Sequence, residues 1–426
     1  MLQIDHVYEF FYSTIFKGFS LYHCFNGVIN TNTDQLTFSD IAVFTPESAT
    51  TKKIFFYDQE PLLDKLTDRY FDMFKYPEGY SLEKIYKLNN TNRLPYKLPQ
   101  ISQLEMDFYI SNPQYAYKQK TIVTSEKSVL ANKYAEKYNT RLLYYFFHGF
   151  AALDWYRGFY ALNYSKSTNL PYKYDFVSYN RLLIDDRSYR LYFISLLAEH
   201  NLIQNNLISF GVAESNNCWM NELTDPATKL SKSAINHILK YAPRQKLIVD
   251  NACVPGSASA DILRTLSVFR PNHTQPNVDA FWHIVTETVF YYDKLHLTEK
   301  IFKPIVSKQP FMLLAAPGNL AYLKSYGFKT FDGIIDESYD TIVDNDQRTE
   351  AVVAQIAWYC ALTAEEKRRV IEAIAPIVEY NFHHFYGEFK HIITRELLDN
   401  CRTLFKEIGH DDSAIAYDNI HRVLTS

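Results

Sequence analysis

The sequence predicts an α/β fold in which two doubly wound domains face a cleft and a helical tail follows them. Short apolar runs alternate with helical or polar segments in the first 165 residues, and the same alternation begins again after residue 170. This pattern is typical of parallel strands covered by helices. The length of 426 residues agrees with two domains at roughly 100–200 residues each. We expect the domains to span residues 1–165 and 170–380, and the C-terminal helices to span residues 381–426.

Three segments of the first domain show a strand followed by a turn or a helix: residues 52–61, 119–138 and 140–159. The first is an apolar strand that stops at Asp58. The second reads as a strand, a Ser/Glu turn and a helix, which Ser125 or Ser128 can cap. The third opens with a β-prone run that ends at His148. Polar side chains therefore follow the strands of this domain.

The second domain repeats the alternation of strands and helices seen in the first, after a polar, proline-containing linker at residues 161–172. A capping box from Thr363 to Glu366 opens a helix of the tail, and residues 388–409 carry apolar positions at helical spacing. The predicted strands of the domain are residues 173–180, 206–211, 245–251, 280–290 and 309–318.

Composition and charge exclude several classes of protein. The formal net charge of −4 gives no basic field for nucleic acid, although a local basic groove stays open. Five scattered cysteines without a CxxC pair indicate free thiols in a reducing compartment. The first residues lack the basic region of a signal peptide, and no apolar run approaches a membrane span of about 20 residues. We expect a cytoplasmic protein, in the host cytoplasm if a phage encodes it.

The segment "LHLTEKIFKP", residues 295–304, has the features of a phosphate-binding helix start. Thr298 suits the N-cap and Glu299 suits the first turn, so a plain helix start explains both. Lys300 and Lys303 are harder to explain, because the helix dipole disfavours cations near the N-terminus. An anion bound by the free N–H groups would reconcile them. Glu299 would then accept hydrogen bonds from a ribose diol.

The surrounding residues 282–328 resemble the donor-binding segment of the α1,3-fucosyltransferase family and of related phage and viral glycosyltransferases. In that family a strand ending in Glu precedes Thr/Ser-Glu-Lys by about a dozen residues. Here Glu287 ends the strand, and Thr298 begins the Thr-Glu-Lys triplet. Thr288 and Val289 replace the family's Asn and Ser, so the resemblance leaves the sugar and the nucleotide open.

The resemblance implies two Rossmann-like domains of the GT-B type, with the last helix crossing back to the first domain. It also implies that Glu287 and the Thr-Glu-Lys triplet, together with Lys303, hold a nucleotide sugar. Three arginines, Arg181, Arg187 and Arg190, follow the first strand of the second domain. Guanidinium groups suit a diphosphate, and the resemblance implies that at least one of them neutralises it, with Arg181 preferred and Arg187 next. A surface cluster paired with the two aspartates between them is the alternative.

An inverting transfer also needs a base that accepts the proton of the attacking hydroxyl. The strand ends of the first domain offer Asp58, Glu60, His148 and Asp154. Glu60 ranks first, because the resemblance implies an acidic base from the N-terminal domain, and His148 or Asp154 comes next. The structural alternatives are a turn and a helix start for the first pair of carboxylates, and a buried hydrogen-bonded imidazole for His148.

We therefore expect a nucleotide-sugar-dependent glycosyltransferase that uses neither a metal nor a bound cofactor. The Asp-x-Asp pattern at residues 342–346 fits helix capping better than a metal site, and no His/Cys pair has zinc spacing. The absence of P-loop and dinucleotide motifs weakens those classes. The acceptor is either a glycan or a hydroxymethylated base in phage DNA. The alternative is a non-catalytic GT-B-like protein that binds a nucleotide, a glycan or DNA.

Overall fold

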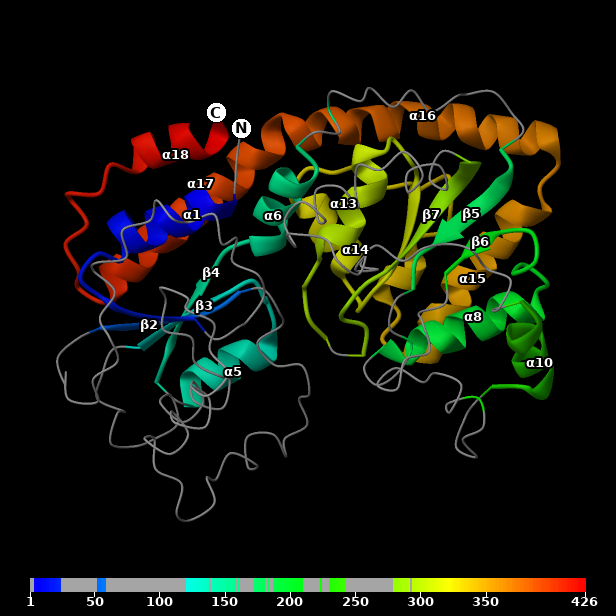
Figure 1. The fold of residues 1–426 in the computed structure, drawn as a ribbon, viewed down its shortest axis with the longest axis horizontal. Coiled ribbons are helices and arrows are strands. Elements are labelled where there is room, and N and C mark those ends of the chain that lie inside the picture. The colour runs from blue at the N-terminus through cyan, green and yellow to red at the C-terminus, as the bar shows by residue number, and fades with distance from the viewer. Residues whose placement is uncertain are drawn as a thin grey trace, which may run out of the picture. The chain divides into compact units, whose positions relative to one another are not determined.

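The computed structural model describes residues 4–23, 52–58, 120–137, 139–157, 160, 172–180, 183, 187–209, 223, 230–241, 279–291 and 293–426. The chain divides into two compact units (Figure 1). The first comprises Met1–Asp154 with Lys390–Ser426, and the second comprises Trp155–Phe389. Each unit contains a four-stranded parallel sheet. The predicted α/β class with parallel sheets and a helical C-terminal region is thus confirmed.

The sheet of the first unit runs in chain order, β1-β2-β3-β4. Its strands are β1 (Ser20–His23), β2 (Lys53–Tyr57), β3 (Lys120–Thr124) and β4 (Arg141–Tyr144). The last register pair between β2 and β3 is Tyr57 with Thr124, so both strands end at the same level. The described apolar residues of β2 and β3 are buried, as expected for a parallel sheet covered by helices.

Helices from both ends of the chain pack in the first unit. They are α1 (Ile4–Phe10), which continues into a π-helical turn (Phe11–Ile15), α5 (Val129–Lys137), α6 (Phe147–Trp155), α17 (Glu388–Glu407, in this unit from Lys390) and α18 (Tyr417–Thr425). Their core is aromatic: the Phe16 ring lies 5.9 Å from Phe405 and 6.2 Å from Phe56. Asn400 donates a 2.9 Å hydrogen bond to the Tyr144 carbonyl. Helix α17 therefore stabilises the end of β4.

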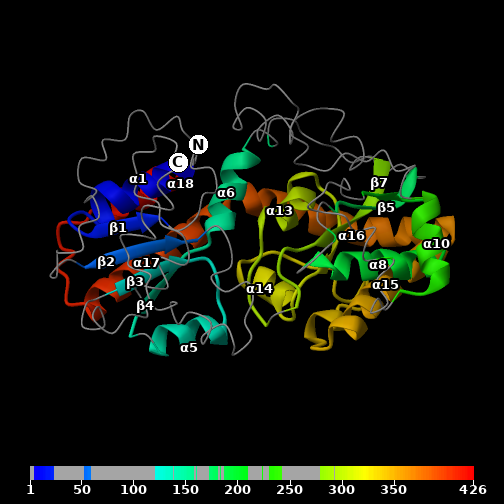
Figure 2. The same cartoon turned by 60° about the horizontal axis from the view of Figure 1, so that its bottom comes forward.

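The sheet of the second unit has the order β6-β5-β7-β8. Its strands are β5 (Tyr174–Ser178), β6 (Leu207–Ile208), β7 (Ala280–Thr286) and β8 (Phe311–Leu314). Strands β5 and β7 lie side by side (Figure 2). Every residue of β7 is buried, including His283 and Thr286, as expected for a parallel strand that is covered on both faces. The chain places β6 on one side of β5 and β7 on the other. The order of the described strands therefore reverses between β5 and β7, which is where doubly wound folds bind ligands.

Two groups of helices pack around this sheet. Helix α13 (Glu299–Val306) contacts β7 and β8 and is covered by α16 (Ala364–Tyr386). Helix α15 (Asn345–Ala361) contacts β8 and α8 (Tyr189–Glu199), which in turn contacts α10 (Lys232–Tyr241). The short α14 (Asn319–Ser325) follows β8. In the described part of the chain, no helix has the length and apolar character needed to cross a membrane.

Several local predictions can be compared with the structure. The capping box between Thr363 and Glu366 is present, and Asp344 caps α15 by accepting a 2.8 Å hydrogen bond from the Gln347 amide. Ser128, rather than Ser125, caps α5.

The β-prone run after residue 140 was predicted to extend to His148, but β4 ends at Tyr144 and His148 lies in α6. A continuous apolar run does not distinguish a buried strand from a buried helix. The predicted linker at 161–172, except Tyr172, and the predicted strand at 245–251 lie outside the described residues.

Candidate functional site

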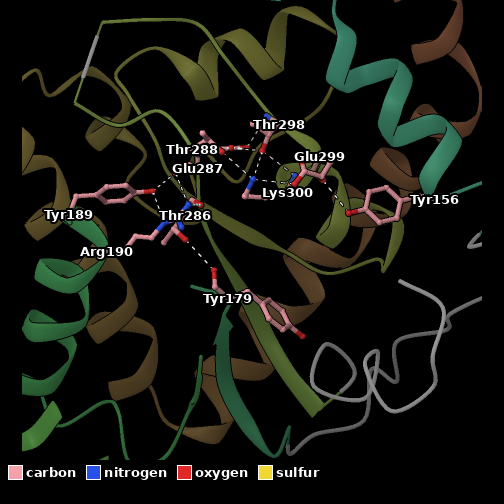
Figure 3. A network of polar contacts seen from close by, with 10 residues as sticks. All are labelled: Tyr156, Tyr179, Tyr189, Arg190, Thr286, Glu287, Thr288, Thr298, Glu299 and Lys300. Carbon is pink, nitrogen blue, oxygen red and sulfur yellow. Dashed lines mark hydrogen bonds and ion pairs between the residues drawn. The ribbon is translucent and has the colours of Figure 1, made fainter. Parts of the chain in front are cut away.

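The candidate site lies at the carboxyl ends of β5 and β7, where the strand order reverses. Tyr179 and Asn180 follow β5, and Glu287 follows β7. The Thr286 hydroxyl contacts the Tyr179 carbonyl at 3.3 Å (Figure 3). It donates to Asn180 Oδ1 at 3.0 Å. These hydrogen bonds fix the two strand ends against each other. Polar side chains are thus held rigidly at the edge where a ligand of such a fold binds.

Glu287 is fully buried and uses its carboxylate inside the protein. Its Oε2 accepts hydrogen bonds from the Thr298 hydroxyl at 2.6 Å and from the Thr288 amide at 3.1 Å, and its Oε1 accepts one from the Thr298 amide at 3.1 Å. Burial raises the pKa of this carboxyl, and the Lys300 charge and the Thr298 hydrogen bonds only partly oppose the rise. Glu287 therefore joins the end of β7 to the beginning of α13, and its predicted contact with a donor would be indirect.

Thr298 is the N-cap of α13, as predicted. Its backbone is extended, with φ −106°, and its hydroxyl oxygen accepts a 3.4 Å hydrogen bond from the Lys300 amide. Pro304 lies inside the helix, which ends two residues later at Val306. The helix is therefore short, and its N-terminal end lies next to the strand edge.

Lys300 is held at this N-terminus by three oxygen atoms. Its Nζ lies 3.1 Å from the Thr288 hydroxyl, 3.1 Å from the Thr298 hydroxyl and 3.1 Å from Glu299 Oε1. An ammonium group has three donors, so these contacts use all of them. Burial lowers the pKa of Lys300, but the charges of Glu299 and Glu287 outweigh burial and leave the pKa raised. The side chain is 34% exposed, so a charged amine lies within reach of solvent.

The three predicted arginines have different surroundings. Arg190 is buried and donates from Nη2 to the carbonyls of Thr286 and Glu287, both at 3.0 Å. The Tyr189 hydroxyl donates to the same Glu287 carbonyl. Arg190 therefore satisfies the carbonyls at the end of β7 and stabilises this edge. Arg187 lies just before α8 and is partly exposed, and Arg181 lies outside the described residues.

Lys303 is buried on α13, with its Nζ 4.1 Å from the centre of the Tyr179 ring. The same ring lies 5.4 Å from the His283 ring on β7. Tyr156 reaches the helix start, where its hydroxyl donates to the Glu299 carbonyl at 3.3 Å. The sequence alone did not place Tyr179 or Tyr156 beside the start of α13. The position of Tyr179 just after a predicted strand was the available signal.

The candidate bases of the first unit lie in separate environments. Asp58 is buried after β2, and its Oδ2 accepts hydrogen bonds from the hydroxyls of Tyr145 at 2.5 Å and Tyr8 at 3.0 Å. Burial raises the pKa of Asp58 to about 6, although the Tyr145 and Tyr8 hydrogen bonds act in the opposite direction. Asp154 is buried and accepts a 3.3 Å hydrogen bond from the Ile4 amide at the start of α1. It therefore supports α1.

His148 is buried in α6 with its ring 5.1 Å from the Phe147 ring, and Glu60 lies outside the described residues. The contacts of Tyr8 and Tyr145 with Asp58 could not be predicted, because 50 and 87 positions separate these tyrosines from it. Among the residues that the structure describes, no group of three or more His, Cys, Asp or Glu side chains is arranged to hold a metal ion.

No protein-family model, curated protein or solved structure matches this chain. Polar groups at the carboxyl edges of the two sheets indicate what the protein can bind. The edge of the second unit carries a solvent-accessible ammonium group at a helix N-terminus, which can bind an anion. The edge of the first unit carries a buried carboxyl group with a raised pKa, which can accept a proton near neutral pH.

Proposed function

We propose that the chain is a glycosyltransferase that moves a sugar from a nucleotide-sugar donor to a hydroxyl acceptor. The observation that carries the proposal is the position of Lys300. Its ammonium group lies at the N-terminus of α13, beside the point where the strand order of the second unit reverses. A nucleotide-diphosphate group suits that position because the ammonium charge and the helix dipole both favour an anion there.

The hydrogen bonds around Lys300 support a site organised before the ligand binds. The Thr298 hydroxyl donates to Glu287, so its oxygen presents lone pairs to the Lys300 ammonium. The amine is thereby kept charged and oriented. A phosphate oxygen can take the place of Glu299 Oε1, the only charged member of the three contacts. Glu299, released from Lys300, would then accept hydrogen bonds from the ribose diol of the donor.

The proposed reaction forms one bond and breaks one bond. The acceptor oxygen attacks the anomeric carbon of the sugar, and the bond from that carbon to the diphosphate oxygen breaks. The bonding electrons leave with the nucleoside diphosphate, whose added charge the helix N-terminus and Lys300 stabilise. The acceptor proton passes to a general base. Inversion at the anomeric carbon follows from a single displacement of this kind.

A thermal-shift screen of UDP-, GDP-, CMP- and dTDP-linked sugars tests the proposal. We expect at least one donor to raise the melting temperature of the wild type but not of Lys300→Ala. Lys324→Ala is the matched control, because Lys324 is also a partly exposed lysine of the second unit in a 3.1 Å ion pair, here with Glu337. If no donor stabilises the wild type, or if Lys300→Ala responds as the wild type does, the proposed phosphate site is wrong.

A further inference from the structure

A second polar site lies at the carboxyl edge of the first unit's sheet. Asp58 and Ser125 directly follow the register pair of Tyr57 with Thr124, so they are neighbours just past the ends of adjacent strands. The Tyr145 amide donates to the Thr124 carbonyl at 3.0 Å, which aligns the residue after β4 with the same edge. The side chain of Tyr145 then reaches Asp58 across the end of β3. Ser125 therefore lies between Asp58 and Tyr145.

Among the residues that the structure describes, two buried polar atoms at this edge have no hydrogen-bond partner. They are Asp58 Oδ1 and Ser125 Oγ, on side chains of residues that are 1% and 2% exposed. Buried polar atoms nearly always have a partner, because leaving one unpaired is unfavourable. Two such atoms on adjacent strand ends indicate that an additional group completes the site.

The chemistry of the two atoms restricts what that group can be. Tyr8 and Tyr145 occupy Oδ2 of Asp58, which leaves Oδ1 as an acceptor. The Ser125 hydroxyl can donate and accept. A ligand hydroxyl satisfies both atoms, because it donates to the carboxylate and accepts from the serine. A phosphate, a carboxylate or a carbonyl cannot donate, and the first two are repelled by the Asp58 charge.

We propose that Asp58 Oδ1 and Ser125 Oγ form a subsite that binds one hydroxyl group of a neutral carbohydrate. A polyanionic ligand is disfavoured by the buried carboxylate and by the formal net charge of −4. The role of the subsite as the acceptor site rests on the proposed function, whereas the binding of a hydroxyl does not. Ser125 was singled out in the sequence only as a helix cap, a role that Ser128 fills.

Saturation-transfer NMR of the full-length protein with methyl glycosides of glucose, galactose and mannose tests this subsite without any donor. We expect one glycoside to bind, and both Ser125→Ala and Asp58→Asn to bind it about tenfold more weakly, as for a lost hydrogen bond to a charged or buried group. Thr394→Val is the matched control. Thr394 is also a buried residue of the first unit whose hydroxyl has no partner, but it lies on α17.

The outcomes separate this inference from the proposed function. Lys300→Ala must bind the glycoside as the wild type does, because it alters only the donor site. If no glycoside binds the wild type, or if neither variant weakens binding, the two atoms hold only water and the inference is wrong. Binding of an oligonucleotide containing hydroxymethylcytosine, without binding of any glycoside, overturns the carbohydrate assignment. If one of the two variants does not fold, the other decides.

Discussion

Asp58→Asn should stabilise the protein at neutral pH, and its advantage should shrink as the pH falls. Burial raises the pKa of Asp58 from 3.8 to about 6, against the opposing hydrogen bonds of Tyr145 and Tyr8. A raised carboxyl pKa means that the native state binds the proton more tightly than the unfolded state does. The stability of the wild type therefore falls as the pH rises from about 4 to 6, and the loss is complete above that range.

The size of the effect follows from the two pKa values. Their difference corresponds to about 3 kcal/mol in the free energy of unfolding at neutral pH, at about 1.4 kcal/mol per pH unit. About half of that penalty, roughly 1.5 kcal/mol, is already present at pH 5, because the carboxyl is then mostly ionised in the unfolded state but still mostly protonated in the native state. Asparagine has almost the same shape but no charge, so the variant lacks this pH dependence.

Urea denaturation of the wild type and Asp58→Asn at pH 5.0, 6.0 and 7.5 measures the difference. We expect the stability advantage of the variant to grow by about 1.4 kcal/mol between pH 5.0 and 7.5. Asp411→Asn is the control, because hydrogen bonds from Ser413 lower the pKa of Asp411, so its carboxyl is ionised in both states over this range and the stability difference should not change with pH. A difference between Asp58→Asn and the wild type that does not change with pH would show that Asp58 does not titrate in this range.

Two further substitutions test the packing of the second unit. Glu287→Gln should lower the free energy of unfolding by roughly 2 kcal/mol, because an amide nitrogen cannot accept the hydrogen bonds that Thr288 and Thr298 donate. If urea denaturation shows unchanged stability, Glu287 does not join β7 to α13 as described. Gly327→Ala should cost more than about 1 kcal/mol, since φ is +89° and a Cβ would lie 2.7 Å from the buried His384 ring. An unchanged melting temperature for Gly327→Ala would refute that packing.

Local patterns were sufficient to predict several parts of the fold. The strand β7 and the cap at Thr298 could be predicted from a few adjacent residues, because each is indicated by a pattern within one short segment of the sequence. The limits of β4 could not, because the same apolar run continues into α6. The predicted GT-B arrangement stays a prediction, since it concerns how two units come together.

The roles of the charged side chains could not be predicted in the same way. Arg190 was expected either to contact a diphosphate or to belong to a surface cluster. Its guanidinium group is instead buried against backbone carbonyls at the end of β7. Asp58 depends on tyrosines from α1 and from the residue after β4, which no local pattern brings together. Sequence reasoning selects candidate residues by type and position, but partners from distant segments decide which of their polar atoms are available to a ligand.

Isothermal titration calorimetry of UDP, GDP, CDP and dTDP with the wild type, Lys300→Ala and Lys324→Ala tests the central claim most directly. The claim is that the ammonium group at the N-terminus of α13 binds the diphosphate of a nucleotide sugar. We predict that one nucleotide binds the wild type and Lys324→Ala equally, and binds Lys300→Ala about ten- to a hundredfold more weakly. Equal affinities for all three proteins, or no binding of any nucleotide, would contradict the claim and leave Thr298 and its neighbours as a helix start only.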